Sequence, residues 1–447
     1  MTPIISTLGG PDVTHIFVHD PVALAKNLPL ERRPANFRAY DQRALVMARP
    51  HDVVCMTSSK VDLSYMGFLY ELGVGPEPGN IIELEPVPVS GECLDNDLFC
   101  PSVDSLHRIC ERIPPHNHVV LNPDAGSQKG YVMAQALENL LGRTVKCMGG
   151  SPEVTEAANL KHVAFRKAQE LGIPVARGEI VESSDGQAPN VTRLRSAIRR
   201  YVAETGRVII RSAEGRGGTG IFLVEDNPES ERQALELISR RPLSPVYLVQ
   251  VLYEVAFSPN ILVDVQPDGG AVNVVGISDQ RLNPHLGHIG NVSPSGAHML
   301  NDMSRAAEAL GRWLQEDGYT GLVGFDFVEH ADLRTGRRRW FLAEINARSN
   351  ASVYPTFLMA HLNVRQMDRG FPVIGAFFSM LARIQTVSFR EFRNAFDARL
   401  FNPRTGRGMI PYGFCQEQLC CNMVFLGPSR HEVEAMHTAC VAQLSGR

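Results

Sequence analysis

The pattern of hydrophobic and polar positions changes twice along this chain. Over residues 1–148, short apolar runs such as HIFVH, HDVVCM and HVVLN alternate with helix-like stretches such as MAQALENLLG. Alternating strands and helices are typical of an open sheet with helices on its faces. We therefore expect residues 1–148 to form an N-terminal open α/β domain.

Residues 149–245 have the pattern of a second unit. Ser151 stands before an acidic stretch, as at a capped helix start. A single helix is expected to run from there to Gly172, where Pro174 follows as a stop signal. A strand, a polar loop, another helix and the strand RVIIRS come next, and this order predicts a small subdomain of strands and helices.

From residue 246 onward the pattern is mainly that of strands. The segments VYLVQVLYE, NILVDVQPDGGAVNVVGIS, LVGFDFVEH and RRWFLAEINAR surround one helical stretch, AAEALGRWLQEDG. We expect a second subdomain with its own sheet over residues 246–395 and a small C-terminal unit over residues 396–447. The expected fold class is α/β, with α+β character in the central part.

Composition narrows the classes of partner. A chain of 447 residues exceeds the usual size of a single core, which supports several packed units. A net charge of −4 gives no footprint for a polyanion, so we expect no nucleic-acid partner. No apolar run reaches the ~20 residues of a membrane span and the N-terminus lacks signal-peptide features, so we expect a cytoplasmic protein without a membrane partner. The oligomeric state stays open, with a homodimer as one option.

The strongest chemical signal comes from two predicted strands, GLVGFDFVEH and RRWFLAEINARSN. Glu344, Asn346 and Arg348 alternate with small apolar residues and therefore share one face of their strand. Asp326 lies in the neighbouring strand. Carboxylate and amide oxygens are the ligands that Mg²⁺ takes alongside nucleotide phosphates. A solvated strand face with an internal ion pair is the alternative, although the flanking WFL segment indicates burial.

A Gly-rich segment supplies the second signal. In RVIIRSAEGRGGTGIFLV, a strand ending in Arg211 leads into Gly217 and Gly218 and then into another strand. A strand after the glycines excludes the P-loop and the dinucleotide fingerprint, which need a helix there. Such a hairpin can cover a triphosphate with its backbone N–H groups, or it can be a plain hairpin tip. Only six residues are Lys, the last being Lys167, so later phosphate contacts must use Arg.

The order of these elements resembles the ATP-grasp superfamily over residues 145–360. The resemblance implies that residues 1–148 are a pre-ATP-grasp domain and that ATP is a cofactor. It also implies a set of ATP-binding residues, namely Lys161, Arg211, Gly217, Gly218, Gln250, Val251, Leu252 and Asn260. Two positions depart from the usual pattern, since family members commonly carry Lys at the position of Arg211 and Glu at that of Gln250.

The same resemblance assigns roles in catalysis. It places Mg²⁺, for which Mn²⁺ is an alternative, on Asp326, Glu344 and Asn346, and it makes Arg348 the arginine that stabilises the transition state. The implied activity is that of an ADP-forming ligase, in which a carboxylate becomes an acyl phosphate and is then joined to an amine.

Candidate substrate residues lie in the segment ISDQRLNPHLGHIGNVSPSG. We expect a long polar loop here, with Arg281, His288 and Asn291 in a substrate pocket. A solvated surface loop is the alternative.

Residues along the whole chain, including DQRL, HIGNVSP and CCNMVFLGPSR, resemble peptide ligases of the type that acts in pheganomycin biosynthesis. This likeness implies that a small-molecule carboxylate is joined to the N-terminal amine of a peptide in natural-product biosynthesis. An amino-acid ligase that makes dipeptides or glutathione-like products remains an alternative. A nucleotide-binding protein without catalysis is an alternative of another class.

Overall fold

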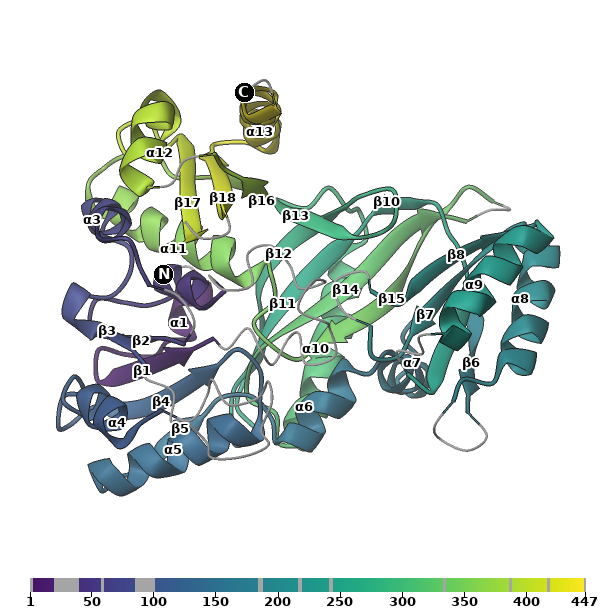
Figure 1. Cartoon of the computed structure of the whole chain (residues 1–447), viewed down its shortest axis with the longest axis horizontal. Coiled ribbons are helices and arrows are strands. Elements are labelled where there is room, and N and C mark those ends of the chain that lie inside the picture. The colour runs from purple at the N-terminus through teal and green to yellow at the C-terminus, as the bar shows by residue number, and fades with distance from the viewer. Residues whose placement is uncertain are drawn as a thin grey trace.

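The strands of the protein assemble into three sheets (Figure 1). The structure is a computed structural model that describes residues 3–19, 40–57, 60–84, 101–183, 188–215, 219–240, 244–332, 335–385, 388–415 and 419–445.

The N-terminal sheet has five strands in the order β3-β2-β1-β4-β5, and every pair in it is parallel. Its strands are β1 (Val13–Val18), β2 (Val53–Met56), β3 (Ile81–Glu83), β4 (His118–Pro123) and β5 (Val145–Cys147). The accompanying helices are α1 (Pro3–Ser6), η3 (Asp41–Val46), α3 (Leu63–Leu72), η4 (Pro78–Asn80), α4 (Val103–Cys110) and α5 (Gln128–Leu141). Helices α4 and α5 pack apolar side chains against the strands, as in other parallel sheets that are covered by helices.

A helix break lies between this sheet and the next. The expected single helix is two helices, α6 (Pro152–Asn159) and α7 (Lys161–Glu170), because Leu160 has an extended backbone with φ −78° and ψ 119°. The capped start is as expected, since the hydroxyl of Ser151 accepts a hydrogen bond from the Val154 N–H at 3.3 Å. The break makes Lys161 the first residue of α7.

The second sheet has four antiparallel strands in the order β6-β9-β7-β8. These are β6 (Gly178–Glu182), β7 (Arg207–Ser212), β8 (Ile221–Glu225) and β9 (Val246–Val251), and they share a core with α8 (Val191–Thr205) and α9 (Pro228–Arg240). Strand β9 belongs to this sheet, although its sequence pattern is continuous with that of the strand-rich segment that follows it.

The third sheet has nine strands. They are β10 (Val255–Phe257), β11 (Pro259–Val265), β12 (Val272–Leu282), β13 (His288–Ser293), β14 (Gly321–Ala331), β15 (Arg338–Asn346), β16 (Ala376–Arg383), β17 (Gly408–Cys415) and β18 (Cys420–Gly427). The order is β10-β14-β11-β12-β13-β16-β18-β17, with β15 also paired to β14. Its helices are α10 (Leu300–Glu316), α11 (Val353–Asp368), α12 (Phe389–Phe396), η5 (Asp397–Arg399) and α13 (Arg430–Ser445). The last strands, β17 and β18, thus extend the sheet that contains β14 and β15.

The prediction of a long loop over residues 277–296 is wrong. Most of this segment lies in β12 and β13, which pair antiparallel and leave only residues 283–287 as the connection. The polar side chains that suggested a loop alternate between two faces of a sheet, so half of them can line a cavity. Residue Asn291, for example, lies opposite Gln280 in this pairing.

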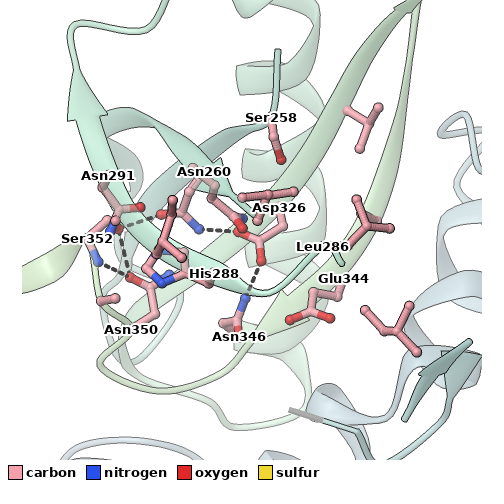
Figure 2. Close-up of a pocket in the computed structure, with 18 of the residues that line it drawn as sticks. Ser258, Asn260, Leu286, His288, Asn291, Asp326, Glu344, Asn346, Asn350 and Ser352 are labelled. Atoms are coloured by element: carbon pink, nitrogen blue, oxygen red, sulfur yellow. Dashed lines mark hydrogen bonds between the residues drawn. The ribbon is translucent and has the colours of Figure 1, made fainter. Parts of the chain in front are cut away.

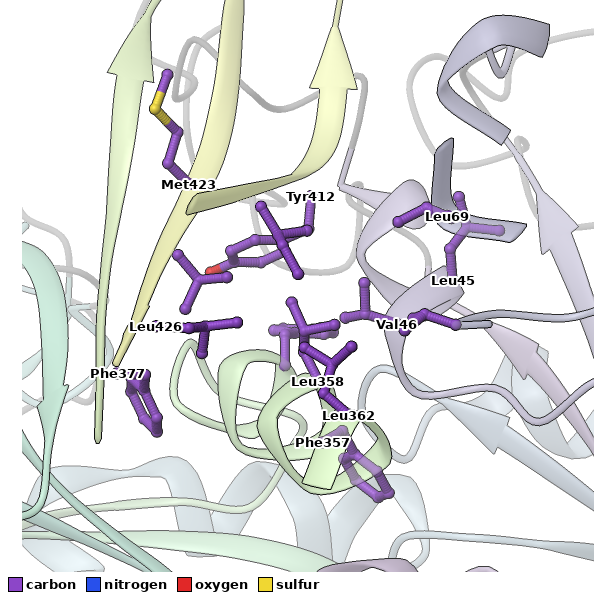
Figure 3. Close-up of a cluster of buried hydrophobic side chains, with 14 of the residues drawn as sticks. Leu45, Val46, Leu69, Phe357, Leu358, Leu362, Phe377, Tyr412, Met423 and Leu426 are labelled. Carbon is purple, nitrogen blue, oxygen red and sulfur yellow. The ribbon is translucent and has the colours of Figure 1, made fainter. Parts of the chain in front are cut away.

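One hydrophobic core joins the first and last parts of the chain (Figure 3). Leu45, Val46 and Leu69 of the N-terminal region pack with Leu358 and Leu362 of α11. The same cluster includes apolar side chains of the C-terminal strands β16, β17 and β18, among them Phe377, Met409 and Leu426. Helix η3 is therefore held against the end of the nine-stranded sheet by shared burial.

The structure confirms the predicted fold class. A parallel α/β sheet comes first and antiparallel sheets with helices follow, as the change in pattern near residue 148 indicates. Among the described residues, none of the helices has both the length and the apolar character that a membrane crossing requires.

Candidate active site

A cavity of about 590 Å³ lies between the four-stranded and nine-stranded sheets. Side chains from β7 and β9 line one side of it, and side chains from β11 to β16 line the other. Volumes of 300–1,000 Å³ are typical of sites for small molecules and cofactors, on the order of this one. Figure 2 shows part of the lining, in which polar side chains from several strands point toward one space.

Two carboxylates face each other in this cavity. Asp326 on β14 is the direct partner of Glu344 on β15, and Asn346 follows on the same face. The register shifts just after Asp326, which bends the strand at the site. The structure therefore brings together the three residues that the sequence predicted as metal ligands, and their role as ligands stays a prediction.

Asp326 is held between two amide groups. Its carboxylate accepts hydrogen bonds from Asn260 Nδ2 at 2.6 Å and from Asn346 Nδ2 at 2.7 Å. Burial and the negative charge of Glu344 raise the pKa of Asp326, although both amide bonds act in the opposite direction. The resemblance implied that Asn260 binds ATP, which stays a prediction; in the structure Asn260 lines the cavity and its side chain holds this carboxylate.

Glu344 faces two cations. Lys161 Nζ lies 3.2 Å and Arg211 Nη2 lies 3.1 Å from Glu344 Oε2. Burial alone would raise the pKa of Glu344, but the charges of Lys161, Arg211 and Arg348 lower it to about 2. Glu344 is therefore ionised at neutral pH.

Lys161 and Arg211 reach this point from different elements. Lys161 stands at the start of α7, its backbone N–H donates to Ala213 O at 3.1 Å, and its ammonium donates to Gly215 O. Arg211, at the end of β7, donates from Nη1 to Ala343 O at 2.9 Å. Both side chains are buried, and burial lowers the pKa of Lys161. The two cations predicted to bind phosphate thus meet at the same carboxylate.

Arg348 adds a third positive charge. It follows β15, lines the cavity and donates from Nη1 to the side-chain oxygen of Asn159 at the end of α6. Its backbone N–H donates to Asn346 O at 2.8 Å, which fixes the chain direction after the strand. The residues on the two sides of the break between α6 and α7 therefore both serve the site: Asn159, before it, binds Arg348, and Lys161, after it, begins α7.

The donor set fits a divalent cation that arrives with a nucleotide. Asp326 and Glu344 offer hard oxygens on adjacent strands, and Asn346 offers an amide oxygen beside them. Among the residues that the structure describes, no three His, Cys, Asp or Glu side chains gather as a metal site. A cation here would therefore rely on two carboxylates, one amide and phosphate oxygens, which is how Mg²⁺ is bound in many nucleotide sites.

The cavity is also lined by three consecutive residues that were predicted to bind ATP. Gln250, Val251 and Leu252 all line it, with Gln250 at the end of β9 and almost fully buried. The backbone N–H of Val251 donates to Arg177 O at 2.8 Å, which fixes this end of the strand. Gly217 and Gly218 of the Gly-rich segment lie outside the described residues.

The candidate substrate residues separate onto two faces of β12 and β13. His288 and Asn291 line the cavity, as expected. Arg281 does not line it, because its neighbours Gln280 and Leu282 in β12 take the cavity face and period two turns Arg281 away. Arg281 instead pairs with Glu434 of α13 at 2.7 Å.

Several lining residues were missed by sequence reasoning. Ser352 donates to Asn260 Oδ1 at 2.6 Å and to Asn350 Oδ1 at 2.7 Å, so a second polar layer supports the Asp326 clamp. The sequence could have indicated these residues, because Asn350 and Ser352 continue the series of polar side chains at every second position that begins at Glu344. Tyr40 and Arg43 of the N-terminal region also line the cavity, and no pattern in the sequence indicated this.

Replacing Gly324 by Ala is expected to disturb this polar layer. A Cβ at Gly324 would lie 1.9 Å from Asn350 Nδ2 and 2.9 Å from Asn260 Nδ2, so both amides must move. We expect the free energy of unfolding to fall by about 1–3 kcal/mol, as for other overpacked sites. Chemical denaturation measures this loss.

Gly67→Ala is the matched control for that variant. Gly67 lies in α3 and a Cβ there would meet nothing within 4 Å, so its replacement should leave stability unchanged or raise it by up to about 1 kcal/mol. Equal stability of the Gly324→Ala and wild-type proteins would contradict the close approach of Gly324 to the amides.

The comparisons with known proteins agree with this geometry. A family model described as "ATP-grasp domain" matches residues 180–352. A search of curated proteins gave no match.

Three solved structures cover nearly the whole chain. An N5-carboxyaminoimidazole ribonucleotide synthetase in its ADP complex has 12% identity and a TM-score of 0.52, with 96% of each chain covered. The carboxyaminoimidazole ribonucleotide synthase from Aspergillus clavatus, complexed with ATP, has 13% identity and a TM-score of 0.50, covering 97% of this chain and 99% of its own. A biotin carboxylase from Campylobacter jejuni has 16% identity and a TM-score of 0.51, covering 95% and 89%. The chain therefore has the ATP-grasp fold, and its matched ATP-grasp domain spans residues 180–352.

Proposed function

We propose that this protein is an ATP-dependent ligase that activates a carboxylate as an acyl phosphate and joins it to an amine, with release of ADP and phosphate. The observation that carries the proposal is that Arg211, Arg348, Asp326 and Glu344 line one cavity between two sheets, with Lys161 paired to Glu344 directly behind the lining.

The charges of this cluster suit a polyphosphate. Three cationic side chains surround two carboxylates, so the cluster keeps an excess positive charge before any ligand binds. Lys161 and Arg211 are already positioned by backbone carbonyls, and their spare donors can turn from Glu344 to phosphate oxygens. Glu344 and Asp326 would then be free to hold Mg²⁺, for which Mn²⁺ could substitute. When bound, this cation would offset negative charge on the transferring phosphoryl group.

The proposed reaction has two steps. A carboxylate oxygen of the substrate bonds to the γ-phosphorus of ATP as the bond from that phosphorus to ADP breaks. The amine nitrogen then bonds to the acyl carbon, phosphate leaves with the electron pair of the breaking C–O bond, and the nitrogen loses a proton. Lys161 and Arg211 hold the phosphates, while Arg348 stabilises negative charge at the acyl group.

The amine acceptor is the finer part of the proposal. The sequence resemblance to peptide ligases of natural-product biosynthesis favours the N-terminal amine of a peptide, and the carboxylate is then a small molecule derived from an amino acid. The structurally similar proteins named above are synthetases of a carboxyaminoimidazole ribonucleotide and a biotin carboxylase. Bicarbonate therefore belongs among the carboxylates that are tested, together with amino acids that would give dipeptides.

The test measures ADP and phosphate release with Mg²⁺ and ATP against a panel of carboxylates, each with and without amino acids, peptides or other amines. We expect one pair to give ADP and phosphate in equal amounts, with an amide identified by mass spectrometry. Release of AMP, or no release of ADP with any pair, would contradict the proposed ligase. Tight ATP binding without turnover would instead favour a nucleotide-binding protein.

A further inference from the structure

Arg43 brings a charge from the N-terminal region into the far end of the main cavity. It lies in η3, which the shared hydrophobic core holds against α11 and the C-terminal strands (Figure 3). The cavity lining includes Arg43 together with Asn291 of β13, Ser379 of β16 and Asn422 of β18. This end is formed by three parts of the chain that are distant in sequence.

Among the residues that the structure describes, the charge of Arg43 meets no acidic partner. The side chain is only 9% exposed, and no carboxylate of the described residues forms an ion pair with it. Nη2 donates to Asn422 Oδ1 at 3.2 Å, while Nε is buried and finds no hydrogen-bond partner in the described part of the chain. The nearby Asp41 is engaged elsewhere, because it accepts from the Thr57 N–H at 2.8 Å and the Gln42 N–H at 2.9 Å.

Aromatic rings stabilise Arg43 without neutralising it. Its guanidinium lies 4.0 Å from the ring centre of Tyr40 and 5.6 Å from that of Tyr354. Such contacts contribute about 0.5–2 kcal/mol, which is less than the several kcal/mol that burying an isolated charge costs. Buried charges in proteins are usually paired, and a ligand of opposite charge would complete this group.

A second unpaired donor lies at the same end of the cavity. Asn291 is 2% exposed, and its Nδ2 is buried with no hydrogen-bond partner from the described residues. Its backbone is fixed, since the Asn291 N–H donates to Ser379 Oγ at 3.2 Å. Two buried donors that face one cavity predict a ligand that brings acceptor oxygens.

We propose that Arg43 and Asn291 bind an anionic group, a carboxylate or a phosphate, on the substrate that enters beside the nucleotide. This inference rests on the proposed ligase, since it assigns the substrate end of the same cavity. Asn291 lies four strand-to-strand steps from Glu344 in the order β15-β14-β11-β12-β13. Three strands thus lie between those of the two residues in the sheet, and this anionic group is a different one from the carboxylate that is phosphorylated beside Glu344.

Calorimetric titration of the ADP- and Mg²⁺-loaded protein tests the inference. The probes are glutarate, N-acetylglycine and inorganic phosphate, which separate a carboxylate site from a phosphate site. We expect at least one probe to bind the wild type, and its affinity to fall at least ~10-fold in Arg43→Gln, since hydrogen bonds to charged groups contribute about 1.5–3 kcal/mol. Arg43→Lys keeps the charge but loses the planar fork, so it should lie between the two.

Two further variants make the outcome decisive. Asn291→Asp has nearly the same shape but places a negative charge where the anion would lie, so it should also lose the probe. This variant keeps the inference testable if Arg43→Gln fails to fold. Arg365→Gln is the control, because Arg365 joins α11 to Gly73 O at 3.3 Å and does not line the cavity. It should bind the probe as the wild type does.

The inference is overturned if no probe binds the wild type, or if Arg43→Gln and Asn291→Asp bind it with unchanged affinity. Either result leaves the proposed ligase standing, provided that ADP still binds. Failure of the wild type to bind ADP counts against the ligase itself, and ADP affinity is therefore measured first in each protein.

Discussion

Replacing Glu344 by Gln is expected to lower turnover at least ~10²-fold, as when a group that stabilises the transition state is lost. Glutamine keeps the shape of the side chain but removes the charge that faces Lys161 and Arg211 at 3.2 and 3.1 Å. It also removes one of the two carboxylates that could hold a divalent cation. ADP should still bind, because Lys161 and Arg211 remain. Their N–H groups are then no longer held by the Glu344 carboxylate and can bind phosphate. Steady-state kinetics and ADP titration measure the two effects separately.

The fold should survive this change. Breaking a buried ion pair costs about 3–5 kcal/mol, but Lys161 and Arg211 each keep a backbone carbonyl as acceptor, so the loss here should be smaller. Asp264→Asn is the matched control, since burial raises the pKa of this carboxylate on β11 and it lies outside the main cavity. Near-wild-type turnover in Glu344→Gln would remove Glu344 from the catalytic site.

Replacing Arg211 by Met should weaken ADP binding about 10- to 100-fold, which corresponds to a lost charge-assisted hydrogen bond of about 1.5–3 kcal/mol. Arg211 lies near the end of β7 and is only 8% exposed, so a methionine can fill the volume of its side chain without leaving a cavity. Turnover should fall with affinity, because the same group would hold the phosphate during transfer.

Two companion variants define the role of Arg211. Arg211→Lys keeps the positive charge at a position where ATP-grasp proteins commonly carry Lys, and it should recover most of the lost ADP affinity. Arg207→Met changes an exposed arginine at the start of the same strand and should have no effect. Wild-type ADP affinity in Arg211→Met would contradict its assignment to phosphate.

The main elements could be predicted because their patterns are local. The alternation of Glu344, Asn346 and Arg348 with small apolar residues gave β15 and its cavity face, and the apolar run around Asp326 gave β14. Period two is set by the backbone of a strand, whatever surrounds it. The structure therefore places Asp326, Glu344 and Asn346 together at the cavity, and their role as metal ligands stays a prediction.

The errors arise where tertiary pairing overrides a local pattern. Leu160 suits a helix, yet an extended backbone there lets Lys161 start a new helix beside Ala213. The polar segment that suggested a loop is a hairpin, because β13 pairs with β12 along one edge and with β16 along the other. The wrong placement of Arg281 in the pocket has the same cause. Without recognising the strand, one cannot tell which of its residues face the cavity and which face away.

Arg43 marks the limit of sequence reasoning at the site. Nothing in DQRAL distinguishes this arginine from an ordinary surface residue. Its position follows from the core that joins η3 to α11 and β17, and that core depends on contacts between residues more than 300 positions apart, such as Arg43 with Asn422. That no carboxylate of the described residues pairs with it can be seen only in the folded structure.

The most direct test of the central claim follows oxygen atoms through one turnover. The active carboxylate is prepared with ¹⁸O in both oxygens and reacted with ATP and the matching amine, and the released phosphate is analysed by mass spectrometry. An acyl phosphate requires one labelled oxygen to pass from the carboxylate to inorganic phosphate in each turnover. Label that appears in AMP, or phosphate that stays unlabelled while amide forms, would contradict carboxylate activation by phosphoryl transfer.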